Sequence, residues 1–176
     1  GCSLLDAADP AVLDGTGDSY HWSGRAFRRD HGRLRSEGTS GEGPIFSPCA
    51  AAALYRRSAW QAVGGLDEDF FCYLEDVDLG FRLRLQGHQC WHVPEAVCHH
   101  VGSAITGRRS DFSGYHGQRN LVWTYVKNMP GGLFWLLLPL HLLANLAALV
   151  LFTLRGQAAV AWRAKRDASL GLPACW

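Results

Sequence analysis

Residues 64–87, with the sequence GGLDEDFFCYLEDVDLGFRLRLQG, decide how this part of the chain is expected to fold. Apolar residues recur at helical spacing in the second half and a glycine follows them, so we expect a helix over about residues 75–86 that ends at Gly87. Three carboxylates fall in its first turn: Glu75, Asp76 and Asp78. Four aromatic or apolar residues come directly before them: Phe70, Phe71, Tyr73 and Leu74.

This acidic cluster has two interpretations. The helix dipole favours acids at a helix start, and Asp78 and Arg82 have the i,i+4 spacing of an ordinary ion pair. A carboxylate beside apolar surface instead tends to have a raised pKa, which suits a general base. The histidine pair 99–100 and the basic residues Arg108, Arg109 and Arg119 downstream favour the second interpretation, since they suit a metal and a phosphate leaving group.

Composition limits the class of protein. A chain of 176 residues with 48% hydrophobic and 19% charged residues is long and apolar enough to form a packed core. A net charge of +1, without any nucleic-acid-binding signature, argues against nucleic acid as a partner. The six cysteines include no CxxC pair, so we expect free thiols and no structural zinc site. The chain begins without Met on an apolar run, so we expect a fragment.

Other elements follow from the same kind of pattern. The segment at residues 6–48 is rich in Gly, Asp, Ser and Arg, and we expect it to be irregular. Ser58 is expected to cap a short helix. The remaining expected elements are a strand at 2–5, a strand or extended segment at 49–57, helices at 58–63 and 115–128, strands at 88–93 (closed by Pro94) and 96–101, and a loop at 102–113.

Residues 133–154 contain no charged residue and reach the roughly 20 apolar residues that a membrane-spanning helix needs. Basic residues follow closely, as they do on the cytoplasmic side of a span: Arg155, Arg163, Lys165 and Arg166. We expect membrane contact, either spanning the bilayer or lying in its interface. The alternative is a buried hairpin of core helices broken at Pro139.

The segments ALYRRSAW, VGGLDEDFFCYLEDVDLGFRLRLQG, VPEAVCHHVGSA and RNLVW together resemble the C-terminal half of family 2 glycosyltransferases. They are most similar to the bacterial rhamnosyltransferase-like group that builds cell-surface polysaccharides. The resemblance covers about residues 45–130. It implies an α/β, Rossmann-like GT-A fold, with residues 1–128 as the C-terminal, acceptor-side part of the catalytic domain. Residues 129–176 would be a hydrophobic, membrane-associated helical tail with a basic flank.

The resemblance also implies roles for single residues. Asp76 would be the catalytic base, with Glu75 orienting the acceptor or tuning that base. His100 matches the position of a histidine that holds a divalent cation, Mg²⁺ or Mn²⁺. Acceptor-binding residues would be Asp67, Glu68, Tyr73 and Trp60. Diphosphate-binding residues would be Arg108, Arg109 and Arg119.

The implied activity is inverting transfer of a sugar from a nucleotide-sugar to a glycan or lipid-linked acceptor, at the cytoplasmic face of the inner membrane. The family's donor half, with its Asp-x-Asp motif, has no counterpart in this sequence, so we expect the isolated chain to be inactive. The main alternative is a non-catalytic, membrane-associated module that binds a glycan or a partner. A metal-dependent hydrolase using Asp76, Asp78 and the histidines is a third hypothesis.

Overall fold

The computed structural model describes residues 1–39, 41–102 and 110–175. The described chain forms two compact units, each assembled from separate stretches of sequence. The first unit contains residues 1–19, 26–68 and 75–102. The second contains residues 20–25, 69–74 and 110–175.

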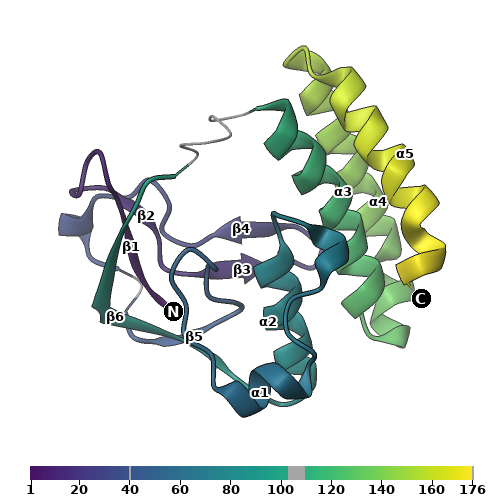
Figure 1. Ribbon diagram of the computed structural model, residues 1–176. Coiled ribbons are helices and arrows are strands. Elements are labelled where there is room, and N and C mark those ends of the chain that lie inside the picture. The colour runs from purple at the N-terminus through teal and green to yellow at the C-terminus, as the bar shows by residue number, and fades with distance from the viewer. Residues whose placement is uncertain (40, 103–109, 176) are drawn as a thin grey trace. The chain divides into compact units, whose positions relative to one another are not determined.

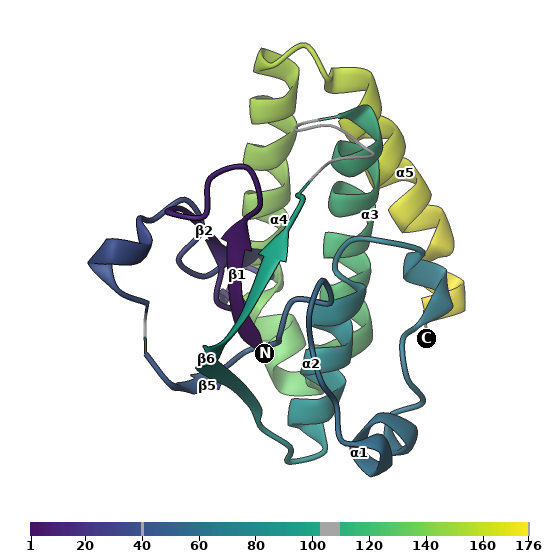
Figure 2. The same ribbon diagram turned by 60° about the vertical axis from the view of Figure 1, so that its left-hand side comes forward.

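The first unit is built on a mixed four-stranded sheet in the order β2-β1-β6-β5. Its strands are β1 (Cys2–Asp6), β2 (Leu13–Gly15), β5 (Gly43–Ile45) and β6 (Cys90–His100). The first strand, β1, runs parallel to β6 and antiparallel to β2, and Figures 1 and 2 show it between them. The short strands β3 (Asp18–Tyr20) and β4 (Ala26–Arg28) pair separately.

Two α-helices and the sheet share the core of the first unit. These are α1 (Arg57–Ala62) and α2 (Glu75–Leu85), and the 3-10 turns η1 (Arg35–Glu37) and η2 (Glu68–Phe70) lie in the connections. One core cluster joins β5, α2 and β6 through Ile45, Leu79, Leu83 and Cys90. The apolar run that predicted the first strand supplies Leu4 and Leu5, which are almost completely buried. The sheet and the apolar side of α2 therefore hold the first turn of α2 in place.

The elements expected at residues 2–5, 58–63, 75–86 and 115–128 are confirmed as β1, α1, α2 and α3 (Asp111–Asn128). The prediction that residues 6–48 are irregular was wrong, because this segment contains the strands β2 to β5. No strand forms at residues 49–57, and α1 is preceded by Arg56 without a side-chain cap, so the Ser58 cap was wrong.

A single strand, β6, replaces the two strands expected on either side of Pro94. The partner of Cys2 is Val93 and the partner of Ser3 is Val97, so the pairing skips three residues there. Proline is accommodated at such an irregularity because it has no N–H to give to the ladder. The strand therefore continues to His100, which places that histidine in the sheet.

The second unit contains three helices: α3 (Asp111–Asn128), α4 (Gly131–Leu154) and α5 (Ala158–Cys175). Figures 1 and 2 show them side by side, with α5 packed against both α3 and α4. Ser110 caps α3 by accepting a hydrogen bond from the Ser113 N–H. The Trp123 indole packs on Phe70 and donates to the carbonyl of Ala168, which fixes α5 on α3.

The apolar helix α4 continues through Pro139, so the broken hairpin was wrong. It is long and apolar enough to cross a membrane, and only 6% of its most apolar window is buried. Two of its polar residues have partners elsewhere in the second unit: His141 bonds to the Ser23 carbonyl, and Asn145 bonds to His141 and to Lys165. Membrane contact and the division at residue 128 stay predictions.

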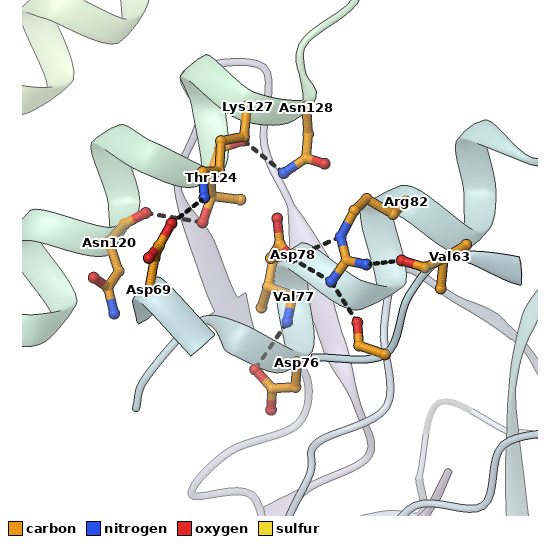
Figure 3. Close-up of polar contacts among 11 residues, drawn as sticks. Val63, Asp69, Asp76, Val77, Asp78, Arg82, Asn120, Thr124, Lys127 and Asn128 are labelled. Atoms are coloured by element: carbon orange, nitrogen blue, oxygen red, sulfur yellow. Dashed lines mark hydrogen bonds and ion pairs between the residues drawn. The ribbon is translucent and has the colours of Figure 1, made fainter. Parts of the chain in front are cut away.

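An ion pair inside α2 ties that helix to the end of α1. Asp78 is fully buried and accepts from Nε and Nη2 of Arg82 at 2.9 and 2.7 Å. The same guanidinium donates to the carbonyls of Val63 and Gly65 (Figure 3). This is the pair predicted from the i,i+4 spacing. Because Asp78 is used in this way, it is a structural residue, which argues against the hydrolase hypothesis.

Replacing Asp78 with alanine is expected to lower the free energy of unfolding by about 3–5 kcal/mol, because the largely buried Arg82 loses its counter-charge. Urea unfolding followed by circular dichroism measures this change. Arg56→Ala is the control: its side chain is exposed, and we expect a change within about 0.5 kcal/mol. A loss no greater than that of the control would show that the pair does not stabilise α2.

Candidate active site

The first turn of α2 holds the Asp76 carboxylate between two backbone donors. Its Oδ1 accepts from the N–H of Val77 at 2.9 Å (Figure 3). Its Oδ2 accepts from the N–H of Ala50, also at 2.9 Å. Each carboxylate oxygen has a second lone pair, so a ligand hydroxyl can still bind. The helix start thus fixes the carboxylate that the sequence singled out.

Glu75 lies beside Asp76 and has one oxygen that the protein does not satisfy. Its Oε2 is buried and has no hydrogen-bond partner among the residues that the structure describes. Burial, followed by the nearby charge of Asp76, raises the pKa of Glu75. A buried acceptor without a donor costs free energy, so this position suits a donor supplied by a bound ligand.

A third carboxylate, Asp18 on β3, was not predicted. The residue is only 7% exposed, and the Ser47 hydroxyl donates to its Oδ2 at 3.5 Å. Burial raises the pKa of Asp18 to about 7, and the charge of Asp76 adds to this, while Arg28 opposes it. Asp18 lies in a glycine-rich segment without periodicity, so only the fold brings it to α2.

Arg28 on β4 supplies the positive charge of this cluster. Its Nη1 donates to Oδ2 of Asp14 at 2.7 Å, and its Nη2 contacts the Cys49 thiol at 3.2 Å. Its charge also acts on Asp18. We did not predict a role for Arg28, because it belongs to a run of arginines that looks like a solvated loop.

His100, the predicted metal ligand, is oriented by a second carboxylate that we had not assigned. Its Nδ1 lies 2.6 Å from Oδ2 of Asp14, and the side chain of Asp14 is largely buried. With Nδ1 engaged, Nε2 is the nitrogen left for a ligand. Carboxylate–histidine pairs of this kind orient histidines that bind metals. His99 is exposed and alternates to the other side of β6, as expected.

The described residues fit a divalent cation only in part. Within residues 1–39, 41–102 and 110–175, no group of three or more His, Cys, Asp and Glu side chains is arranged to hold a metal ion. His100 has the geometry of one ligand, and Asp14 has that of its partner. Further ligands would have to come from outside this set.

The other predicted acceptor residues are divided between the two units. In the first, Asp67 is half-buried and Glu68 is exposed. Trp60 on α1 lies 5.3 Å from the Tyr55 ring and packs against the core cluster of the first unit. In the second, Tyr73 lies 6.3 Å from the Phe112 ring. Trp60 therefore has the contacts of a core residue.

Of the predicted diphosphate-binding residues, Arg108 and Arg109 lie outside the described residues. Arg119 on α3 donates to the carbonyls of Asp69 and Phe70, both at 3.0 Å. Its guanidinium lies over the Trp123 ring, 4.2 Å from the centroid. Arg119 therefore holds the segment that leads into α2.

That segment, residues 69–74, has an unusual backbone. Phe71, Tyr73 and Leu74 all have positive φ, between 62° and 67°, which is uncommon outside glycine. The Asn120 side chain donates to the carbonyls of Phe70, Cys72 and Tyr73 at 2.7–2.9 Å. Such conformations persist where the surroundings enforce them, often at functional sites. The sequence contains no signal for this clamp.

Comparison with known proteins shows the family of this chain. The family described as Glycosyl transferase family group 2 matches residues 11–164. The chain belongs to this glycosyltransferase family. The match covers the whole cluster around Asp76, from Asp14 to His100. The family membership predicted from the sequence is confirmed, and so is the mixed α/β architecture with a parallel strand pair.

Two curated relatives carry the same name, N-acetylglucosaminyl-diphospho-decaprenol L-rhamnosyltransferase, in the CDC 1551 and H37Rv strains of Mycobacterium tuberculosis. Each is 38% identical to this chain over 106 residues. The aligned segment covers 60% of this glycosyltransferase chain and 32% of the relative's length. The similarity therefore concerns about a third of the relatives.

Asp18→Asn is expected to make stability less dependent on pH. Because the pKa of Asp18 is raised in the folded state, its contribution to the free energy of unfolding is fully present below about pH 4. This contribution is lost as pH rises towards 7. The asparagine variant should therefore gain roughly 2 kcal/mol relative to wild type between pH 5 and pH 8. Urea unfolding at several pH values measures this difference.

Glu95→Gln is the matched control, since it removes a carboxylate from an exposed position. If the free energy of unfolding of both variants changes with pH in the same way as that of wild type, Asp18 does not hold a proton near neutral pH.

Proposed function

We propose that this protein is an inverting glycosyltransferase that transfers a sugar from a nucleotide-sugar to a glycan or lipid-linked acceptor in bacterial cell-surface polysaccharide synthesis. The observation that carries the proposal is the fixed carboxylate of Asp76, next to the unsatisfied Oε2 of Glu75, in a chain of this family. The relatives' name, which includes a diphospho-decaprenol, supports a lipid-linked acceptor.

The reaction we propose is a single displacement at the anomeric carbon. Asp76 takes the proton of an acceptor hydroxyl while that oxygen attacks the anomeric carbon and the bond to the nucleoside diphosphate breaks. Glu75 Oε2 accepts a hydrogen bond from the acceptor and so orients it. Attack from the side opposite the leaving group inverts the configuration, and no covalent enzyme intermediate is formed.

The remaining assignments follow the resemblance. Asp67, Glu68 and Tyr73 would contact the acceptor, whereas the packing of Trp60 supports a structural role. The arginines 108 and 109 would bind the diphosphate, and the hydrogen bonds of Arg119 add a positioning role. His100 would hold Mg²⁺ or Mn²⁺ through Nε2, with Asp14 fixing the ring. When bound, such a cation would supply Lewis-acid stabilisation of the departing diphosphate.

We further propose a GT-A catalytic fold at the cytoplasmic face of the inner membrane, with the apolar side of α4 against the bilayer. The isolated 176-residue chain is expected to show no sugar transfer, because its described residues offer one metal ligand and not a complete set. Sugar transfer by that chain with any nucleotide-sugar and Mg²⁺ or Mn²⁺ would refute this expectation. A glycan-binding module remains the rival if the full-length gene product binds a glycan but transfers no sugar.

Asp76→Asn in the full-length gene product is expected to lower turnover by about 10²–10⁴-fold, the usual contribution of a general base. Steady-state assays with saturating donor and acceptor measure this, and donor binding should not change. The control is Glu95→Gln, which is exposed and should keep wild-type turnover. Turnover within threefold of wild type for the Asp76 variant would remove the base assignment.

His100→Ala is expected to weaken Mn²⁺ binding to the full-length gene product, and Asp14→Asn to weaken it about 10–100-fold. Calorimetry or electron paramagnetic resonance of Mn²⁺ reads binding without requiring activity. The adjacent, exposed His99→Ala is the matched control and should bind Mn²⁺ like wild type. Equal affinities for the His99 and His100 variants would rule out a metal role for His100.

A further inference from the structure

Helix α5 has an outer face of a kind that is uncommon on soluble proteins. Trp162 and Leu170 are 63% and 72% exposed, and the Arg166 side chain is 69% exposed. With Arg163 they recur at helical spacing and so lie along one side. The opposite side is made of small buried residues: Ala161, Ala164 and Ala168. Arginines next to an exposed indole and an exposed leucine favour a helix at a membrane surface.

The outer face of α5 is hollowed. A cavity of about 600 Å³ lies over it, lined by Ala159, Trp162, Arg163, Lys165, Arg166 and Ser169. Arg163 and Arg166 bring positive charge to this lining, and none of the six residues is acidic. The volume lies within the range of sites that hold small molecules.

The charges around this cavity favour an anion. From residue 129 onward the sequence has four basic residues, Arg155, Arg163, Lys165 and Arg166, and one carboxylate, Asp167. Asp167 is already bonded to Arg166 at 2.7 Å and to the Tyr115 hydroxyl at 2.9 Å. Its charge is therefore largely compensated, and the arginines leave a net positive field over the cavity.

The side chain of Lys165 is largely withdrawn from solvent. Its Nζ donates to the Gln118 carbonyl and to Asn145, and burial lowers its pKa to about 7. A phosphate over the cavity would favour the charged form of this lysine.

The neighbouring helix α4 indicates that the anion at α5 belongs to a lipid bilayer. Only Arg155, Gly156 and Gln157 separate the two helices, and they pack on each other. The most exposed large residues of α4 are all apolar: Trp135, Leu136, Leu142, Leu143, Leu146 and Leu154. An exposed apolar surface of this extent marks a protein or membrane contact. A bilayer offers both the apolar phase for α4 and the phosphates for α5.

We propose that the outer face of α5 binds anionic phospholipid headgroups, with Arg163 and Arg166 on the phosphates and Trp162 and Leu170 in the boundary between headgroups and acyl chains. The apolar side of α4 then supplies the part of the membrane affinity that does not depend on charge. The proposal deepens the membrane contact proposed above, and it does not depend on glycosyl transfer.

The test is vesicle flotation of the whole chain, with phosphatidylcholine vesicles compared with vesicles containing 30% phosphatidylglycerol. The double variant Arg163→Gln/Arg166→Gln should bind the anionic vesicles roughly 30-fold less tightly, equivalent to about 1 kcal/mol for each arginine. It should bind the neutral vesicles like wild type. High salt should remove the preference of wild type for the anionic vesicles.

The matched control is Arg56→Gln/Arg57→Gln, which removes the same charge from exposed positions in the first unit. It should bind anionic vesicles within twofold of wild type. Trp162→Gln should weaken binding to both kinds of vesicle. Because Arg163 also lies over the Tyr115 ring, the single variant Arg166→Gln keeps the test valid if the double variant does not fold.

Three outcomes would overturn the proposal. Equal losses in the α5 and α1 double variants would mean that net charge alone sets binding. If wild type binds both kinds of vesicle equally and inorganic pyrophosphate binds in the cavity, the cavity is a site for soluble phosphates and not for lipid headgroups. Self-association at the α5 face, without vesicle binding, would make it an interface between copies. Asp76→Asn should bind vesicles like wild type, which separates this test from that of the reaction.

Discussion

The candidate site depends on one constraint, which is the repulsion among three partly or fully buried carboxylates: Asp18, Glu75 and Asp76. Burial raises the pKa values of Asp18 and Glu75, and the nearby charge of Asp76 raises both further. Close carboxylates in low dielectric cannot all be ionised without compensation. Arg28 is the cation that acts on this group, and Asp14 holds Arg28 in place. A proton on Asp18 near neutral pH reduces the repulsion beside the proposed base.

Asp14 connects this cluster to the sheet. It bonds Arg28 on β4 and His100 at the end of β6, while it lies itself on β2. The position of His100 therefore depends on β6 continuing past Pro94, and the position of Arg28 depends on β4. On the other side, residues 69–74 enter α2 from a strained backbone that Asn120 and Arg119 hold. Leu74 is followed directly by Glu75, so this held segment ends where the first turn of α2 begins.

The sequence predicted the parts of the fold and site that have local signals. The helix at 75–86, the Asp78–Arg82 pair and the exposed His99 all follow from spacing within one element. Asp14, Asp18 and Arg28 were missed because they lie in short strands within a glycine-rich segment, where neither the helical nor the strand period is expressed. They meet α2 only through long-range pairing. Pro94 and Pro139 misled for a related reason, since proline is accommodated at a bulge, or within a helix whose neighbours stabilise it.

The two sides of α4 bear on how such a helix meets a membrane. Two of its polar residues point inward, where His141 stacks on the Tyr125 ring at 4.0 Å and Asn145 bonds Lys165 of α5. A helix that crosses a bilayer alone has no protein partners for its polar side chains. Polar groups without partners are costly in hydrocarbon. With these groups satisfied by α5 and by Ser23, the other exposed side chains of α4 are apolar except for Thr153, whose hydroxyl donates to the Leu149 carbonyl. The helix therefore combines the hydropathy of a span with the packing of a bundle member, as the proposed contact with lipid on one side and protein on the other requires.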